Sequence, residues 1–223
     1  MADTIAIDLE DFQINANSID GATPLQNAIE FGHLETVMFL VKQAGAGVEW
    51  KDENGQTPLT WAAEIGDLET VMFLVKEASA NVESKDENGW TPLSWAAKNG
   101  NLETVMFLVK EASADVQSKD ENGQTPLSWA AAHGHLKAVR FLVEEAGADI
   151  ESKDERGKTA LDLVRQEGPK YSWKKEGCNA VVALLEGNAT RRGTGREPAV
   201  ATIMQAWSIF FFLFCILYFV FMS

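Results

Sequence analysis

The sequence predicts an all-α solenoid of helix-turn-helix units joined by β-turn loops, plus one C-terminal transmembrane helix. Three observations predict it: a motif that recurs every 34 residues, two helical patterns within each repeat, and an uncharged apolar stretch late in the chain. The expected organisation is an N-terminal cap segment at 1–17, a repeat domain at 18–187, a basic linker at 188–198 and a transmembrane helix at 199–222.

The repeat is the organising feature of the chain. Thr-Pro-Leu begins at Thr23, Thr57, Thr91 and Thr125, and Thr-Ala-Leu begins at Thr159, each 34 residues after the one before. The likeness extends beyond the triplet, because residues 67–78 and 101–112 differ only in their first residue. The sequence therefore contains about five copies of one structural unit.

The first half of each unit predicts a short helix. Thr91 is a suitable N-cap, and Pro92 fits the first helical position, where no backbone N–H is needed. Gly100 is expected to end this helix, because glycine adopts the left-handed conformation at little cost. The equivalent glycines are Gly32, Gly66, Gly134 and Gly168.

The second half predicts another helix, from about Leu102 to residues 112–113. Its expected buried stripe comprises Leu102, Val105, Leu108 and Val109, at helical spacing. A polar segment at 118–123 follows and ends in Asn-Gly, which is typical of a turn. Successive helix pairs are therefore expected to be joined by tight loops.

These features together resemble the ankyrin repeat, over about residues 12–187, in a style similar to repeats abundant in filamentous fungi. The resemblance implies a solenoid that binds proteins and has no reaction centre. Two departures stand out. The histidine that usually follows Thr-Pro-Leu is replaced, by Gln26, Thr60, Ser94, Ser128 and Asp162. The repeat is also one residue longer, and if Ser79 and Ser113 take the left-handed conformation that Gly normally fills, each costs about 1 kcal/mol.

The two ends of the array are expected to differ from its middle, because terminal repeats lack a neighbour on one side. Residues 169–177 interrupt the last unit, and an apolar helix is expected at 178–185, with Val181, Val182 and Leu185 buried. At the other end, the predicted cap is short and centred on residues 5–9.

Residues 199–222 carry no formal charge and would span about 36 Å as a helix, enough to cross a bilayer. Arg191, Arg192 and Arg196 precede this stretch, so the positive-inside rule predicts that the repeats face the cytosol. The segment resembles the spans of tail-anchored proteins. The chain is therefore expected to be a single-pass membrane protein, located in the endoplasmic reticulum. A buried terminal helix and an artefact of gene prediction are the alternatives.

Charge and motif content argue against several kinds of function. The chain carries a net charge of −14, which disfavours nucleic acid as a partner. No phosphate loop, nucleophile motif or zinc motif occurs in the sequence, so we expect no enzyme activity, cofactor, metal or small-molecule substrate. The two cysteines form no disulfide framework. His33 and His135 are expected to be structural, and the Asp-Glu pairs are expected to be solvated turns.

The resemblance places partner binding at the loop bases and on the exposed side of the first helices. The corresponding residues are Gln56, Trp90, Gln124 and Lys158 at the loop bases, and Phe31, Ile65, Asn99 and His133 late in the first helices. Trp90 is the leading candidate, with packing against a neighbouring loop as the alternative. We expect Trp61, Trp95 and Trp129 in the core, and Met38, Met72 and Met106 partly buried on the outer face.

The expected function is that of a scaffold or adaptor that holds a protein client at a membrane surface. Two alternatives stay open: an accessory protein of a fungal secondary-metabolite pathway, and a regulator that sequesters a transcription factor. The client itself is not identified by any motif.

Overall fold

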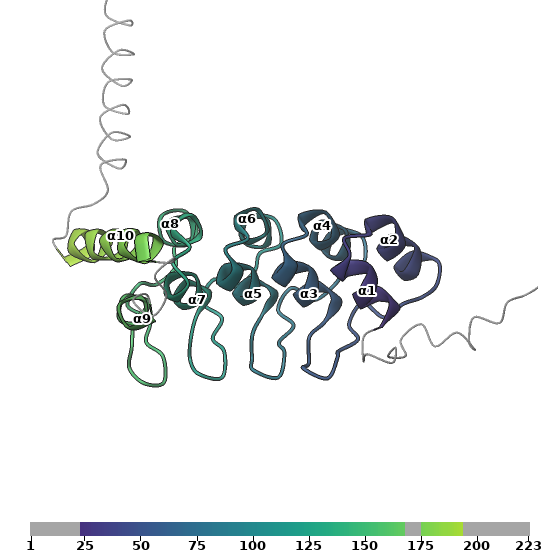
Figure 1. Ribbon diagram of the computed structural model, residues 1–223, viewed down its shortest axis with the longest axis horizontal. Helices are drawn as coiled ribbons and strands as arrows, with labels where there is room; N and C mark the ends of the chain where they lie inside the picture. The colour runs from purple at the N-terminus through teal and green to yellow at the C-terminus, as the bar shows by residue number, and fades with distance from the viewer. Residues whose placement is uncertain (1–22, 168–174, 194–223) are drawn as a thin grey trace, which may run out of the picture. The chain divides into compact units, whose positions relative to one another are not determined.

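The computed structural model describes residues 23–167 and 175–193. The described residues form helices and loops without strands, as predicted. The first helices of the repeats lie in one layer and the second helices in another, with the connecting loops extending away from both (Figure 1). The helices are α1 (Pro24–Glu30), α2 (Leu34–Lys42), α3 (Pro58–Ile65), α4 (Leu68–Lys76), α5 (Pro92–Asn99), α6 (Leu102–Lys110), α7 (Pro126–Ala132), α8 (Leu136–Glu144), α9 (Ala160–Glu167) and α10 (Lys175–Gly193).

The predicted caps of the first helices are confirmed. Thr91 has an extended backbone, and its hydroxyl accepts a hydrogen bond from the Ser94 N–H, while Pro92 occupies the first turn. Gly100 ends α5 in the left-handed conformation, as Gly66 does for α3. In α1 and α7 the helix ends earlier, so that Phe31 and His133 are the capping residues and the glycine follows.

The residues that replace the family histidine form hydrogen bonds within the same helix start. The hydroxyls of Thr60, Ser94 and Ser128 lie 2.9 to 3.2 Å from the hydroxyl of the capping threonine three residues earlier. In the last repeat, the Asp162 carboxylate accepts hydrogen bonds from the Thr159 N–H and hydroxyl, at 3.0 and 2.9 Å. These bonds, the backbone one foremost, hold the pKa of Asp162 below its usual value.

The second helices bury a stripe that differs from the predicted one. In α6 the buried residues are Thr104, Val105, Phe107 and Leu108, whereas Leu102 and Val109 are only half-buried. The helix also ends at Lys110, slightly earlier than predicted. The apolar residues of LETVMFLVK surround much of the helix, so periodicity alone did not determine which side faces the neighbouring repeats.

Contacts between neighbouring second helices repeat along the array. Lys110 Nζ lies 2.7 Å from the Glu145 carboxylate and 5.1 Å from the centre of the Phe141 ring, and the same arrangement joins the two preceding pairs. Exposed ion pairs contribute about 0.2–1 kcal/mol each. Each lysine ammonium also lies over a phenylalanine ring of the next repeat, so a cation–π contact adds to the pairing.

The loops are hydrogen-bonded to one another across repeats. Lys85 Nζ donates to the Lys119 carbonyl at 2.8 Å, and the Glu121 N–H donates to the Asn88 carbonyl at 3.1 Å. Equivalent bonds run from Lys51 to Lys85 and from Lys119 to Lys153. The array of loops is therefore a continuous hydrogen-bonded structure.

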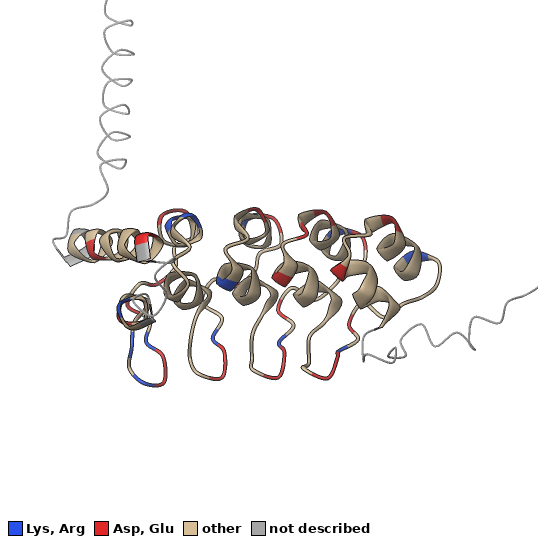
Figure 2. Ribbon diagram, viewed as in Figure 1, with Lys and Arg blue, Asp and Glu red and all other residues tan. Residues whose placement is uncertain are grey.

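The aspartate of each Asp-Glu pair is an internal acceptor, and the expectation of a solvated pair is wrong for this residue. Asp86 is 8% exposed, and its carboxylate accepts hydrogen bonds from the N–H groups of Asn88 and Trp90 and from the Trp95 indole, at 2.9 to 3.0 Å. Glu87 next to it is exposed, as expected for a turn. Figure 2 shows acidic residues recurring along these loops.

Ser79 and Ser113 adopt the left-handed conformation that the longer repeat was expected to require of them. Ser79 and Ser113 have φ angles of 57° and 59°, and the equivalent Gly45 and Gly147 have 73° and 71°. Two L-residues therefore occupy a conformation that glycine accepts at lower cost.

The last described helix partly matches its prediction. Val181 and Leu185 are buried, whereas Val182 is half-buried. The helix continues to Gly193, through the predicted start of the linker. The predicted cap at 1–17, most of the 169–177 interruption and the predicted span at 199–222 lie outside the described residues, as does Gly168. Within the part that is described, no helix is both long and apolar enough to cross a membrane.

Candidate protein-binding surface

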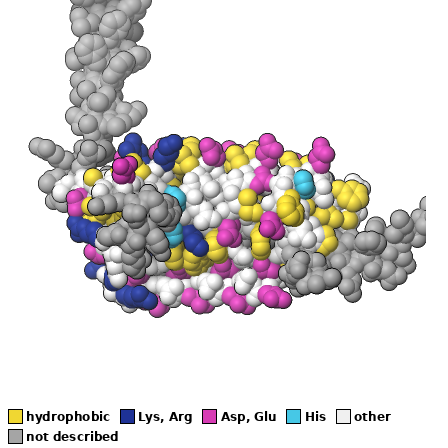
Figure 3. Space-filling view, in the orientation of Figure 1, with side chains coloured by type: hydrophobic (Ala, Val, Ile, Leu, Met, Phe, Trp, Pro, Cys, Tyr) yellow, Lys and Arg dark blue, Asp and Glu magenta, His cyan; other side chains and the backbone are white. Residues whose placement is uncertain are grey.

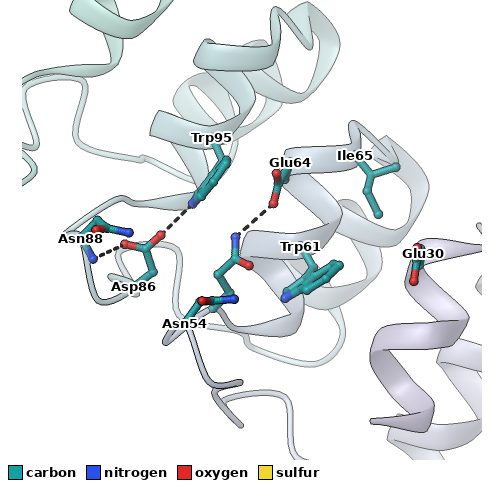
Figure 4. Close-up of a pocket in the computed structure, with 9 residues that line it drawn as sticks. Glu30, Asn54, Trp61, Glu64, Ile65, Asp86, Asn88 and Trp95 are labelled. Atoms are coloured by element: carbon teal, nitrogen blue, oxygen red, sulfur yellow. Dashed lines mark hydrogen bonds between the residues drawn. The ribbon is translucent and has the colours of Figure 1, made fainter. Parts of the chain in front are cut away.

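The loop bases and the first helices form a recess within the first three repeats of the array. Its volume is about 490 Å³, and Figure 4 shows the side chains around it. It draws on α1, α3, α5 and two loops, with lining residues Glu30, Asn54, Gln56, Trp61, Glu64, Ile65, Asp86, Asn88 and Trp95. We call Glu30, Trp61, Glu64, Ile65 and Trp95 the acidic recess.

The tryptophans of the first helices are only half-buried, so the prediction that they lie in the core is wrong, and two of them, Trp61 and Trp95, line the recess. Trp61, Trp95 and Trp129 are half-buried, and each indole N–H donates to the loop aspartate nine residues earlier, at 2.9 to 3.0 Å. The indole N–H is a polar group that a dry core would leave without an acceptor. These bonds connect each loop to the helix that follows it.

Trp90 packs within the loop base and is 8% exposed. Its ring centroid lies 4.5 Å from that of Trp95 and 4.1 Å from that of Trp129. The Lys98 ammonium lies 4.6 Å from the Trp90 ring and 4.3 Å from the Trp95 ring. Trp90 therefore adopts the packed arrangement that the sequence left open, and a role in binding stays a prediction.

The predicted residues at the ends of the first helices differ in exposure. Phe31 is 69% exposed and Ile65 is 44% exposed, so both offer apolar surface. Asn99 is exposed, but its amide donates to the Glu64 carbonyl at 2.8 Å, which connects α5 to α3. His133 is half-buried and lies 3.1 Å from the Trp129 carbonyl.

The remaining loop-base candidates are less exposed than predicted for binding residues. Gln56 is 6% exposed, and its amide donates to the Glu64 carboxylate at 3.0 Å. Gln124 and Lys158 are half-buried, and Lys158 donates to Gln166. Of the predicted residues, Gln56 and Ile65 line the recess, and only Phe31, Ile65 and Asn99 are exposed.

His135 has the structural role predicted for it. Its Nε2 lies 2.8 Å from the Lys98 carbonyl, at the end of the preceding first helix. Asn101, one repeat earlier, donates to the Ala63 and Glu64 carbonyls, at 3.0 Å each. These side chains satisfy carbonyl groups that the end of a helix leaves without partners.

On the outer face, Met38, Met72 and Met106 are half-buried, as expected. Among the described residues, no group of histidine, cysteine and acidic side chains is arranged to hold a metal ion.

Sequence reasoning missed Glu30 and Glu64, which flank Trp61 in the recess. A signal was present in the sequence, because this position changes from Glu30 and Glu64 to Lys98 and Ala132 while the Thr-Pro-Leu framework is kept. Positions that vary on a constant framework are candidates for recognition.

The architecture defines a helical repeat protein, and comparison with known families identifies which one. A family model of ankyrin repeats in three copies matches residues 4–86 and 63–154. The chain belongs to the ankyrin repeat family, whose repeats act in protein–protein interaction and are in general not enzymatic. No curated protein matches the chain in sequence.

Proposed function

We propose that this protein is a membrane-anchored scaffold or adaptor that presents its ankyrin repeats to a client in the cytosol. The observation that carries the binding part is the exposed apolar surface of Phe31 and Ile65 beside an open recess. Large apolar side chains at the edge of a recess are typical of protein-binding sites.

The framework around this surface suits it to binding. Loop-to-loop hydrogen bonds and the indole–aspartate bonds hold the recess side chains in place before a partner arrives. A preformed surface loses less conformational entropy on association than a flexible one, which favours affinity.

The anchoring part of the proposal is based on the sequence. Residues 209–221 contain eleven Ile, Leu, Phe or Val residues, and at about −0.3 to −0.6 kcal/mol each these favour insertion. Anchoring would raise the local concentration of the repeats near membrane-bound clients. The endoplasmic reticulum is the membrane that we expect.

The anchoring is tested by comparing the full chain with a chain that ends at Pro198. We expect the full chain to stay in the membrane pellet after alkaline carbonate extraction and the shortened chain to be released. If both chains are released, the membrane part of the proposal is wrong.

The orientation is tested at the sequon Asn188-Ala189-Thr190, which would be glycosylated only in the lumen. We expect no change in mass after deglycosylation, with Thr190→Ala as the control. A mass decrease in the wild type that Thr190→Ala abolishes would place the repeats in the lumen and contradict the proposal.

The scaffold role is tested by proximity labelling from the repeats, with and without residues 199–223. Recovery of a reproducible set of clients that depends on those residues is the expected result. Enzymes of one pathway or a transcription factor in that set would favour the corresponding alternative role.

A further inference from the structure

We propose that the acidic recess binds a Lys or Arg side chain of the protein client, from a segment that also carries a large apolar residue. This inference rests on the proposed scaffold function and names the chemistry of the partner. Figure 3 shows acidic and hydrophobic side chains next to one another on the visible face of the repeats.

The second and third repeats provide an internal comparison. In the third repeat, the Lys98 ammonium lies over the Trp95 ring at 4.3 Å, so this surface holds a cation against an indole in the structure itself. One repeat earlier, the equivalents of Trp95 and Lys98 are Trp61 and Glu64. The tryptophan is kept, while a carboxylate replaces the cation.

The charges around Trp61 favour a cation from outside the chain. Glu30 and Glu64 both line the recess, and no ion pair within the described part of the chain involves either. The Glu64 carboxylate accepts a hydrogen bond from the neutral amide of Gln56. A Lys or Arg side chain could therefore pair with a carboxylate of the recess and lie against the indole face.

The apolar part of the partner is indicated by the residues next to the two glutamates. Phe31 follows Glu30 and Ile65 follows Glu64, and both apolar side chains are exposed, at 69% and 44%. The corresponding neighbours in the next two repeats are Asn99 and His133, which are polar. The combination of acidic and apolar side chains is thus confined to the first two repeats.

The affinity of the full chain in detergent for synthetic peptides tests this proposal. The probes are dodecapeptides with one central Lys or Arg and a Leu or Phe nearby, in a Gly-Ser background. A matched set carries Gln in place of the cation. We expect binding of the cationic set, weakened by raising the salt concentration, and little binding of the Gln set.

The informative variant is Glu64→Lys, because the next repeat has lysine at this position within the same helical framework. We expect at least a tenfold loss of affinity for the cationic peptides, which corresponds to about 1.4 kcal/mol. Glu53→Lys is the matched control, since it changes the net charge equally at an exposed loop residue that does not line the recess. It should retain affinity within about twofold if long-range charge is a small factor. Glu30→Gln provides a second test, and because Glu30 is exposed, this change carries little risk to folding.

Several results would overturn the inference: no binding of any peptide, equal binding of the cationic and Gln sets, or equal effects of Glu64→Lys and Glu53→Lys. Tighter binding of a peptide made from residues 188–198 would indicate a second copy of this chain as the occupant. If proximity labelling recovers clients equally with Glu64→Lys, only the recess is refuted. Failure of the scaffold function itself would instead appear as no clients with the wild type.

Discussion

The left-handed serines give the sharpest prediction about stability. Ser79→Gly and Ser113→Gly should each stabilise the fold, because an L-residue at these φ angles costs about 1–2 kcal/mol relative to its preferred conformation. Glycine loses more backbone entropy on folding, which offsets about 0.5–1 kcal/mol. The expected net gain in the free energy of unfolding is therefore about 0.5–1 kcal/mol per site. For a chain of this size, each kcal/mol raises Tm by about 2–4 °C.

This gain is measured by urea unfolding of the full chain in detergent, with tryptophan fluorescence as the signal. Ser79→Ala is the matched control, since it removes the hydroxyl but keeps the left-handed cost, and it should not stabilise. The reverse change, Gly45→Ser, should destabilise by about the same amount that glycine gains at Ser79. If Ser79→Ala stabilises as much as Ser79→Gly, backbone strain is not the reason and the argument is refuted. The dependence of the unfolding free energy on urea concentration has to be the same for the variants and the wild type, because repeat arrays can unfold in steps and the comparison requires a single transition.

Three further predictions concern the framework. Asp120→Asn should cost about 2 kcal/mol in urea unfolding, because an amide cannot accept all three N–H bonds that this buried carboxylate accepts. Gly100→Ala should destabilise the fold more than Gly32→Ala in the same assay. Both glycines have positive φ, but a Cβ at Gly100 would lie 2.4 Å from His135 Nδ1, whereas a Cβ at Gly32 would have no atom within 4 Å. Equal costs would contradict this steric argument. The pKa of Asp162 is lowered in the folded state, so its carboxylate stabilises the fold above the ordinary aspartate pKa, and this stabilisation is lost as the pH falls through the folded pKa. Asp162→Asn should therefore lower the free energy of unfolding by less than about 1 kcal/mol at this exposed site. The difference between the variant and the wild type should vanish in strong acid.

The local features of the fold could be predicted because each depends on a few neighbouring residues. Thr91, Pro92 and Gly100 specify where a helix begins and ends by their own backbone chemistry. The side of α6 that is buried could not be predicted, since Thr104 becomes buried only through packing against its surroundings in the array. Burial between repeats depends on the arrangement of whole helices, which short-range periodicity does not contain.

The candidate site was predictable to a lesser extent. Phe31 and Ile65 were found because the family resemblance identifies their positions. The prediction of core tryptophans depends on their recurrence beside Ala-Ala pairs at the spacing of core positions. The aspartate that binds each indole lies nine residues earlier, on a loop whose path the spacing does not contain. The sequence shows that the position of Glu64 varies between repeats, but the recess that Glu64 lines is formed only when α1, α3 and α5 lie side by side.

The regular ladder of contacts between neighbouring second helices has a consequence for how this chain can change in length. Excision of Leu68–Asn101 would join Asp67 to a second copy of the same nine-residue helix, LETVMFLVK. Lys42 would then meet Glu111 in place of Glu77, with the lost interface rebuilt from identical parts. Recombination between copies could therefore shorten or extend the array by whole units and bring new combinations of surface residues together without a new core.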